Sequence, residues 1–185
     1  MQMNQFKRAA ISSALVAAAM AAGSAHAYEI TLDVAGIYSN GLLGTSGNET
    51  LFVDLFAGAR ITGISLDVTL FAGAPSWLSE IGVDLNDGGS AGFSLFAGIG
   101  DYASGTQSYS GAADLVALAA DFTLGASGRL NFEFFESFDD FPYDWDGLWQ
   151  SGNLTVTYVP EPATFGLAAL ALLGRLPMQP SQDFY

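Results

Sequence analysis

The stretch Ile64–Leu70, with the sequence ISLDVTL, decides the fold class of this chain because apolar and polar side chains alternate along it. The apolar set is Ile64, Leu66, Val68 and Leu70, and the polar set is Ser65, Asp67 and Thr69. Successive side chains of a β-strand point to opposite faces of a sheet, so this period of two is typical of a strand with one buried face. The stretch therefore predicts a half-buried strand.

Two later stretches, residues 130–134 and 153–158, repeat the alternation. Their apolar residues are Leu130, Phe132 and Phe134 in the first, and Leu154, Val156 and Tyr158 in the second. Further strands are expected at Glu29–Val34, Leu51–Phe56, Ile81–Leu85, Gly92–Phe96 and Leu115–Leu124. About eight short strands separated by Gly, Asn, Asp and Ser turns predict an all-β domain, an antiparallel β-sandwich or jelly roll.

Three local features need separate interpretation. The segment Ala112–Ala120 could instead form a short helix, because Ala and Leu favour helices. The tetrapeptide Leu-Phe-Ala-Gly begins at Leu55, Leu70 and Leu95 without a fixed period, so we expect strand ends at which Gly opens a turn rather than a repeat architecture. Trp77 stands alone in the sequence, and we expect it in the core.

The N-terminal residues 1–27 have the features of a secretory signal peptide. Lys7 and Arg8 precede the apolar stretch Ala9–Ala22, and Ala25-His26-Ala27 is a small-x-small cleavage motif. We expect signal peptidase to cut between Ala27 and Tyr28. The alternative is an uncleaved anchor, although the stretch is shorter than the ~20 residues of a spanning helix.

Pro160 and Pro162 mark the other end of the predicted domain. Proline is excluded from sheet and helix interiors, so the last strand is expected to stop near Val159. The apolar run Phe165–Leu173 follows, with the composition of a short helix. The predicted organisation is a signal peptide at 1–27, a β-sandwich domain at 28–159 and a C-terminal tail at 160–185.

The tail resembles the PEP-CTERM sorting signal of Gram-negative bacteria that make extracellular polysaccharide. The resemblance rests on Val159–Leu167, whose Pro160-Glu161-Pro162 matches the motif that precedes a membrane helix in that family. It implies processing by an exosortase-like protease, transient membrane anchoring, and a location at the cell envelope, the outer surface or outside the cell, in association with exopolysaccharide. The chain departs from the pattern after Leu173, since Ala163–Leu176 would span only about 21 Å as a helix against the ~30 Å hydrocarbon core. The alternative is an apolar C-terminal segment without sorting function.

A second resemblance covers residues 61–158. The order of Ile64–Leu70, Trp77–Ile81, Phe134–Asp140 and Gly152–Val156 is similar to that in jelly-roll P-domains and related galactose-binding-like sandwiches. Some of those domains hold structural calcium. The resemblance implies a fold and leaves the function open, because fold does not fix function.

The composition excludes several function classes. The chain has 19 acidic and 5 basic residues and a formal net charge of −14, which argues against a nucleic-acid partner and would attract divalent cations. It has no cysteine, and its single histidine, His26, falls at the predicted cleavage site. The mature chain would therefore lack a thiolate zinc site, a histidine metal site and a Ser-His-Asp triad.

The densest group of chemically active side chains lies in Glu133–Asp146. Crowded carboxylates repel one another and can be relieved by a hard cation with oxygen ligands, so Asp140, Asp144 and Asp146, and next Asp139, are candidate Ca²⁺ ligands. The alternative is a solvated acidic loop. Nearby aromatic rings could stack on sugars, which makes Tyr143, Trp145 and Trp149 candidate glycan contacts.

Glu133 and Glu136 are two nearby carboxyl groups of the kind that can hydrolyse a glycosidic bond. Residues three apart on a strand face opposite sides, which argues against this pair as a catalytic couple. We therefore expect a non-enzymatic surface or matrix protein first, a calcium-dependent carbohydrate-binding module second, and a hydrolase third.

Overall fold

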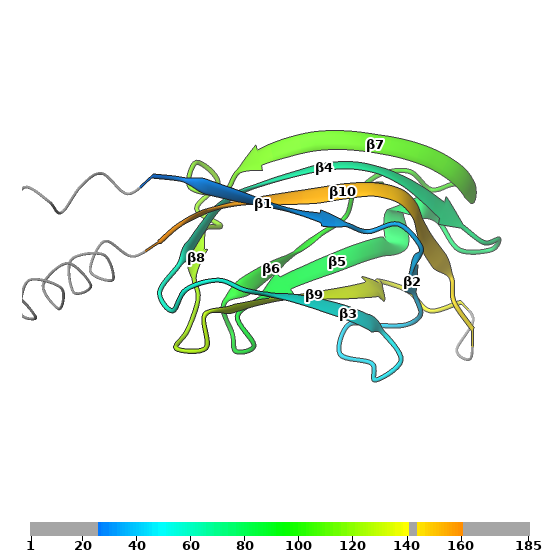
Figure 1. Ribbon diagram of the computed structural model, residues 1–185. Helices are drawn as coiled ribbons and strands as arrows, with labels where there is room; N and C mark the ends of the chain where they lie inside the picture. Colours follow the sequence, from blue (N-terminus) through cyan, green and yellow to red (C-terminus); the bar gives the residue numbers. More distant parts are fainter. Residues whose placement is uncertain (1–25, 141–143, 161–185) are drawn as a thin grey trace, which may run out of the picture. The chain divides into compact units, whose positions relative to one another are not determined.

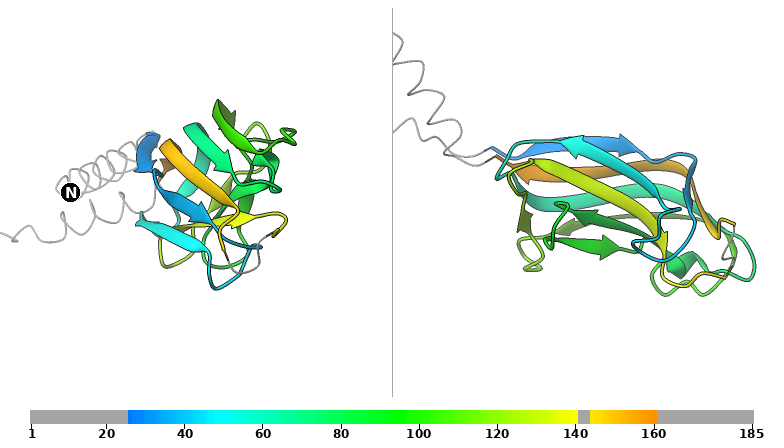
Figure 2. Two further views of the ribbon diagram at one scale, coloured as in Figure 1. Left: turned by 90° about the vertical axis from the view of Figure 1, so that its right-hand side faces the viewer. Right: turned by 90° about the horizontal axis from the view of Figure 1, so that it is seen from below.

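The structure, a computed structural model, describes residues 26–140 and 144–160, and these form two antiparallel sheets (Figure 1). In the first sheet the strand order is β1 (Tyr28–Asp33), β10 (Gly147–Val159), β4 (Arg60–Ala72) and β7 (Gly105–Asp114), with β2 (Ile37–Ser39) pairing β10 and β8 (Phe122–Thr123) pairing β4. In the second the order is β3 (Glu49–Asp54), β9 (Arg129–Glu136), β5 (Ile81–Asn86) and β6 (Gly92–Leu95). The two sheets face each other as a β-sandwich (Figure 2).

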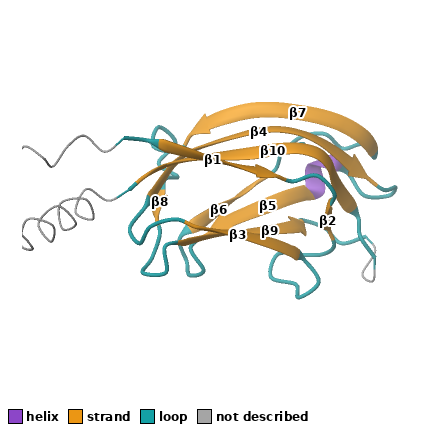
Figure 3. Cartoon of the chain, in the orientation of Figure 1, coloured by secondary structure: helices purple, strands orange, loops and turns teal. Residues whose placement is uncertain are grey.

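The core lies between the sheets and is built from the alternating residues. Ile64, Val68 and Leu70 of β4 are buried, as are Leu154 and Val156 of β10. The largest fully buried side chains are Trp149, Phe132, Phe134, Ile61, Leu70, Ile81, Leu85, Leu130 and Leu154. The expected all-β sandwich is therefore confirmed for the described residues, and η1 (Leu78–Glu80), a single 3₁₀ turn, is their only helical element (Figure 3).

The predicted strand Leu115–Leu124 is wrong except for Phe122–Thr123, and the alternative helix at Ala112–Ala120 is wrong. The strand of this region is β7, which ends at Asp114, and the chain then turns before the two-residue β8. The Asp114 carboxylate accepts hydrogen bonds from the backbone N–H groups of Val116 and Ala117, at 3.0 and 3.1 Å. A side chain that bonds to the following backbone amides favours a turn over a continued strand.

The expectation that Trp77 lies in the core is also wrong, because this residue is 44% exposed. It precedes η1, where its backbone N–H donates to the Glu80 carboxylate at 2.7 Å. Its neighbour Leu78 occupies the core position instead. The Trp77 ring packs edge-on against exposed Tyr102, with 5.4 Å between centroids.

The Leu-Phe-Ala-Gly copies lie at strand ends, as expected: β3 ends at Asp54 just before the first, β4 ends within the second and β6 ends at the start of the third. Gly58, in the first copy, has φ +76°, a left-handed conformation that favours glycine. The tetrapeptide is thus a turn signal.

None of the helical structure in residues 26–140 and 144–160 is both long and apolar enough to cross a bilayer.

Candidate functional site

The acidic segment predicted to bind calcium connects β9 to β10 at one end of the sandwich (Figure 1). Its carboxylates differ in exposure: Asp144 is exposed, Asp139 and Asp140 are half-buried, and Asp146 is fully buried. Tyr143, a predicted glycan contact, lies outside the described residues. The segment is therefore partly a surface loop and partly an extension of the core.

Asp146 is held by backbone groups from three other segments. Its N–H donates to the Ser39 carbonyl at 3.1 Å, and its carbonyl accepts from the Gly73 N–H at 3.0 Å. Its carboxylate accepts from the Asp140 N–H at 2.7 Å. These bonds bring Asp146 and Asp140 together, whereas the bond that the Asp144 carboxylate accepts within the described residues is a local one, from the Trp145 N–H at 2.9 Å.

Glu136, the last residue of β9, is the fully buried acid that sequence reasoning did not assign to the site. Burial raises the pKa of its carboxyl to about 9, with further contributions from the negative charges of Asp146, Glu80, Asp140 and Asp139. Residues Leu130, Phe132 and Phe134 share its inward face. Continuing their alternation by one step would have predicted that Glu136 points into the core.

The position of Glu136 is fixed by its backbone and by a glycine. Its N–H donates to the Gly41 carbonyl at 2.8 Å, and it pairs with Ile81 of β5. A Cβ at position 147 would overlap the Glu136 Oε1 atom and the Ile81 side chain, so any larger residue there would force these two side chains to shift. The carboxyl therefore lies against the first residue of β10.

The cations among the described residues are paired elsewhere. Arg60 contacts Asp121 at 2.6 Å and Arg129 contacts Asp54 at 2.7 Å. The hydrogen bond from each arginine holds the pKa of its aspartate partner below the usual range. Both arginines stand at the opposite ends of β4 and β9 from the acidic segment, since they are the first residues of those strands.

The carboxylates of the described residues do not by themselves form a metal centre. No group of three or more Asp or Glu side chains there is arranged so that it could hold a metal ion. The ligand set Asp139, Asp140, Asp144 and Asp146 therefore stays a prediction. What the fold does bring together is the pair Asp140 and Asp146, with Glu136 nearby.

Trp149 is a correction among the predicted glycan contacts, because it is fully buried. Its ring packs edge-on against Phe134, and its Nε1–H donates to the Ser39 hydroxyl at 3.3 Å. The register between β10 and β4 shifts between Trp149 and Ser151, because β10 has one extra residue there. The side chains of β10 before this bulge therefore alternate in the opposite phase from those after it. Trp149 was a candidate because an aromatic ring near carboxylates can stack on a sugar, and that pattern does not decide which face of β10 the ring occupies.

Trp145, in contrast, is half-exposed and belongs to an aromatic surface. Its ring lies 5.2 Å from that of Tyr38 and 6.0 Å from that of Phe71. Tyr38 and Phe71 both pair with Leu148, so they flank it on the same face of the first sheet, one on β2 and the other on β4. Tyr38 and Phe71 were not predicted as part of this surface, because they come together with Trp145 only through the pairing of β2 and β4 with β10.

Glu133 and Glu136 lie at positions of opposite parity on β9, in agreement with the expectation that they face opposite sides. The Glu133 carboxylate accepts hydrogen bonds from the Gly44 N–H at 2.6 Å and the Asn48 amide at 2.7 Å. It therefore ties the loop before β3 to the outer face of β9.

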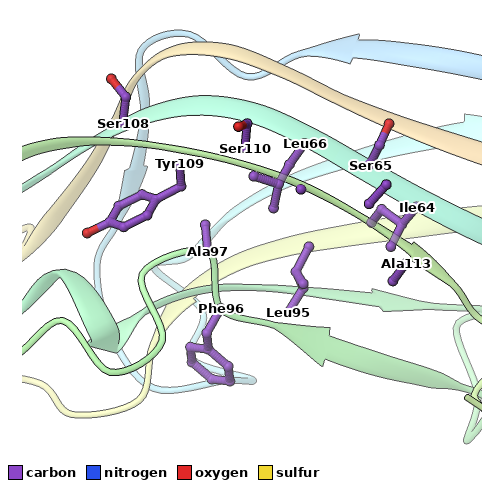
Figure 4. Close-up of a pocket in the computed structure, with 12 residues that line it drawn as sticks. Ile64, Ser65, Leu66, Leu95, Phe96, Ala97, Ser108, Tyr109, Ser110 and Ala113 are labelled. Carbon is purple, nitrogen blue, oxygen red and sulfur yellow. The ribbon is translucent and has the colours of Figure 1, made fainter.

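A groove of about 450 Å³ opens between β7 and the segment that follows β6 (Figure 4). Leu95 and Ala97 line it on one side, Ile64 and Leu66 on the other, whereas the Phe96 ring points away. The Tyr109 hydroxyl at its margin donates to Asp101 at 2.7 Å. The groove is mostly apolar, and none of the predicted site residues lines it.

The start of β1 and the end of β10 lie at the end of the sandwich opposite the acidic segment (Figure 1). Tyr28, which directly follows Ala27, begins β1 and pairs with Tyr158 of β10. Pro160 is the last residue described, and Glu161 and Pro162 lie outside the described residues.

Comparison with known proteins gives little further guidance. No family model and no curated protein matches the chain. Among solved structures, the VP2 subviral particle of infectious bursal disease virus is similar, with a TM-score of 0.34 and 13% identity over 72% of this chain. The match covers 33% of that capsid chain, so this chain spans about a third of its length. A likeness at this level carries no inference about function.

Proposed function

We propose that this chain is a non-enzymatic protein of the cell surface or extracellular matrix of a Gram-negative bacterium. In this proposal signal peptidase removes residues 1–27, and an exosortase-type protease recognises Pro160, Glu161 and Pro162. A short apolar helix after the motif anchors the chain transiently during sorting. The protein then works in association with exopolysaccharide.

The observation that carries the proposal is the position of the two motifs relative to the folded unit. β1 begins at Tyr28, directly after the Ala25-His26-Ala27 motif, and β10 ends at Val159, directly before Pro160. Cleavage at either motif would leave all ten strands intact. Because the ends of β1 and β10 pair, both processing sites would be presented together and away from the acidic segment.

The test replaces Pro160, Glu161 and Pro162 together by alanine in the producing bacterium. We expect the variant to accumulate unprocessed in the membrane fraction, which fractionation and mass spectrometry would measure. The matched control replaces Pro177 and Pro180, which lie in the same tail outside the motif. Unchanged processing and location of the motif variant would refute the sorting proposal.

A second candidate function is calcium-dependent carbohydrate binding, which the surface of Tyr38, Phe71 and Trp145 favours. Aromatic faces of this kind can stack on the apolar faces of sugars. We expect the secreted polysaccharide, cast into a native gel, to retard the protein and Trp145→Ala to abolish the retardation. Trp77→Ala, which removes an exposed ring elsewhere, is the control. Equal migration of wild type with and without polysaccharide would rule this candidate out.

A further inference from the structure

Buried polar side chains gather at one end of the sandwich. Four are buried among the described residues, namely Ser39, Ser76, Glu136 and Asp146. The Asp146 N–H bonds to the Ser39 carbonyl, and the Ser76 N–H bonds to the carbonyl of Gly73, whose own N–H bonds to Asp146. Three of these residues thus form one hydrogen-bonded group, and the charge of Asp146 acts on Glu136.

Glu136 is the unusual member of this group. It is fully buried, and within residues 26–140 and 144–160 neither of its carboxyl oxygens has a hydrogen-bond partner. Leaving a buried carboxylate unsatisfied costs several kcal/mol, and buried acids in folded proteins are normally paired or bound to metals. The carboxyl at this position is relieved either by a proton, which burial favours, or by a bound cation.

Among the described residues, the charged side chains that act on Glu136 are all negative. The carboxyls of Asp146, Glu80, Asp140 and Asp139 act on it, and Asp139 Oδ1 is also buried without a partner among the described residues. The two arginines of the described part, Arg60 and Arg129, are engaged with Asp121 and Asp54. No protein cation in that part of the chain is therefore available to neutralise the cluster.

We propose that Glu136 and Asp146 are the carboxylate ligands of a buried calcium site. Both offer hard oxygen donors, and no cysteine exists in the chain to favour a softer metal. Ca²⁺ accepts carboxylates together with backbone carbonyls and water in flexible geometry, so it does not require three carboxylates at one point. Mg²⁺ demands a more regular octahedron and fits this mixed set less well.

The proposed ion joins the two sheets. Glu136 ends β9 in one sheet, and Asp146 immediately precedes β10 in the other. By holding Asp146, the ion would also restrain Trp145, which directly precedes Asp146 in the sequence. This inference does not depend on the sorting motif, because it concerns only the folded unit.

The test is thermal unfolding of the full chain in CaCl₂ and in chelator. Calcium at a hundredfold excess over its Kd stabilises the folded state by about 2.7 kcal/mol, so we expect the midpoint to rise by several degrees. Glu136→Gln and Asp146→Asn should each abolish the rise. Glu29→Gln, which removes an exposed glutamate on β1, and Asp144→Asn, which removes an exposed aspartate of the same segment, should retain it.

Three outcomes would overturn the assignment. The first is no rise for the wild type, the second is a rise that survives Glu136→Gln but is lost in Asp144→Asn, and the third is an equal rise with MgCl₂. Titration calorimetry of the wild-type chain gives an independent answer if Glu136→Gln fails to fold. We expect about one Ca²⁺ per chain, and no heat of binding at millimolar calcium would refute the site.

Discussion

The ring of Tyr28, at the start of β1, stacks on the ring of Tyr158, near the end of β10, with 5.8 Å between centroids and 29° between planes. The two residues also pair in the antiparallel ladder. This contact lies at the end of the sandwich where β1 begins and β10 ends.

The Tyr28–Tyr158 contact predicts energetic coupling between the two chain ends. A stacked aromatic cross-strand pair contributes about 0.5–1 kcal/mol beyond the area it buries. A double-mutant cycle with Tyr28→Ala and Tyr158→Ala, measured by urea unfolding, should give a coupling energy of that size. Additive effects of the two substitutions would show that the rings act independently.

Stability in the presence of chelator should fall as the pH rises, because of Glu136. The folded-state pKa of about 9 lies above the ordinary value of 4.5, so the folded chain binds more protons than the unfolded chain between these values. The contribution of the protonated Glu136 carboxyl to the free energy of unfolding is fully present below the unfolded-state pKa of 4.5. It is lost as the pH rises through the folded-state pKa of about 9. At pH 7 the loss should be on the order of 3 kcal/mol.

Glu136→Gln should flatten this dependence, since glutamine does not titrate. Denaturant unfolding at a series of pH values between 5 and 9 would measure the slopes of wild type and variant. Glu29→Gln is the matched control and should keep the wild-type slope. Parallel curves for wild type and Glu136→Gln would contradict the assignment of the pH dependence to Glu136.

Gly152 should be intolerant of a side chain. It has φ +113° within β10, and a Cβ there would overlap the Asp67 carbonyl and the Val68 Cα. Backbone strain and the clash together should cost Gly152→Ala about 3 kcal/mol of unfolding free energy. Gly111→Ala on β7, where a Cβ has open space, should change stability by less than about 0.5 kcal/mol.

The sequence was informative where one face of a strand is buried. The alternating sets of β4, β9 and the second half of β10 point inward as predicted. β7 was missed because Thr106, Gln107 and Ser108 are exposed, so no apolar alternation marks this edge strand. An edge strand needs few apolar residues, because its position is fixed by hydrogen bonds to β4.

The candidate site was only half predictable for a different reason. The inward position of Glu136 follows from the period of β9, but its proximity to Asp146 depends on how β10 pairs with β2 and β4. The bulge after Trp149 has no signal in the local pattern, and it exchanges the faces of every residue before it. Long-range pairing therefore decided which aromatic and acidic side chains reach the surface.

The two tryptophans that flank Gly147 should differ sharply in their effect on stability. Trp149 is fully buried against Phe134, so Trp149→Ala should cost about 3–5 kcal/mol, and Trp149→Phe should cost less because it keeps the ring contact. Trp145 is half-exposed beside Tyr38 and Phe71, so Trp145→Ala should cost about 1 kcal/mol or less. Urea unfolding with equal m-values would measure both. Similar losses for the two alanine variants would contradict the placement of Trp149 in the core and of Trp145 at the surface.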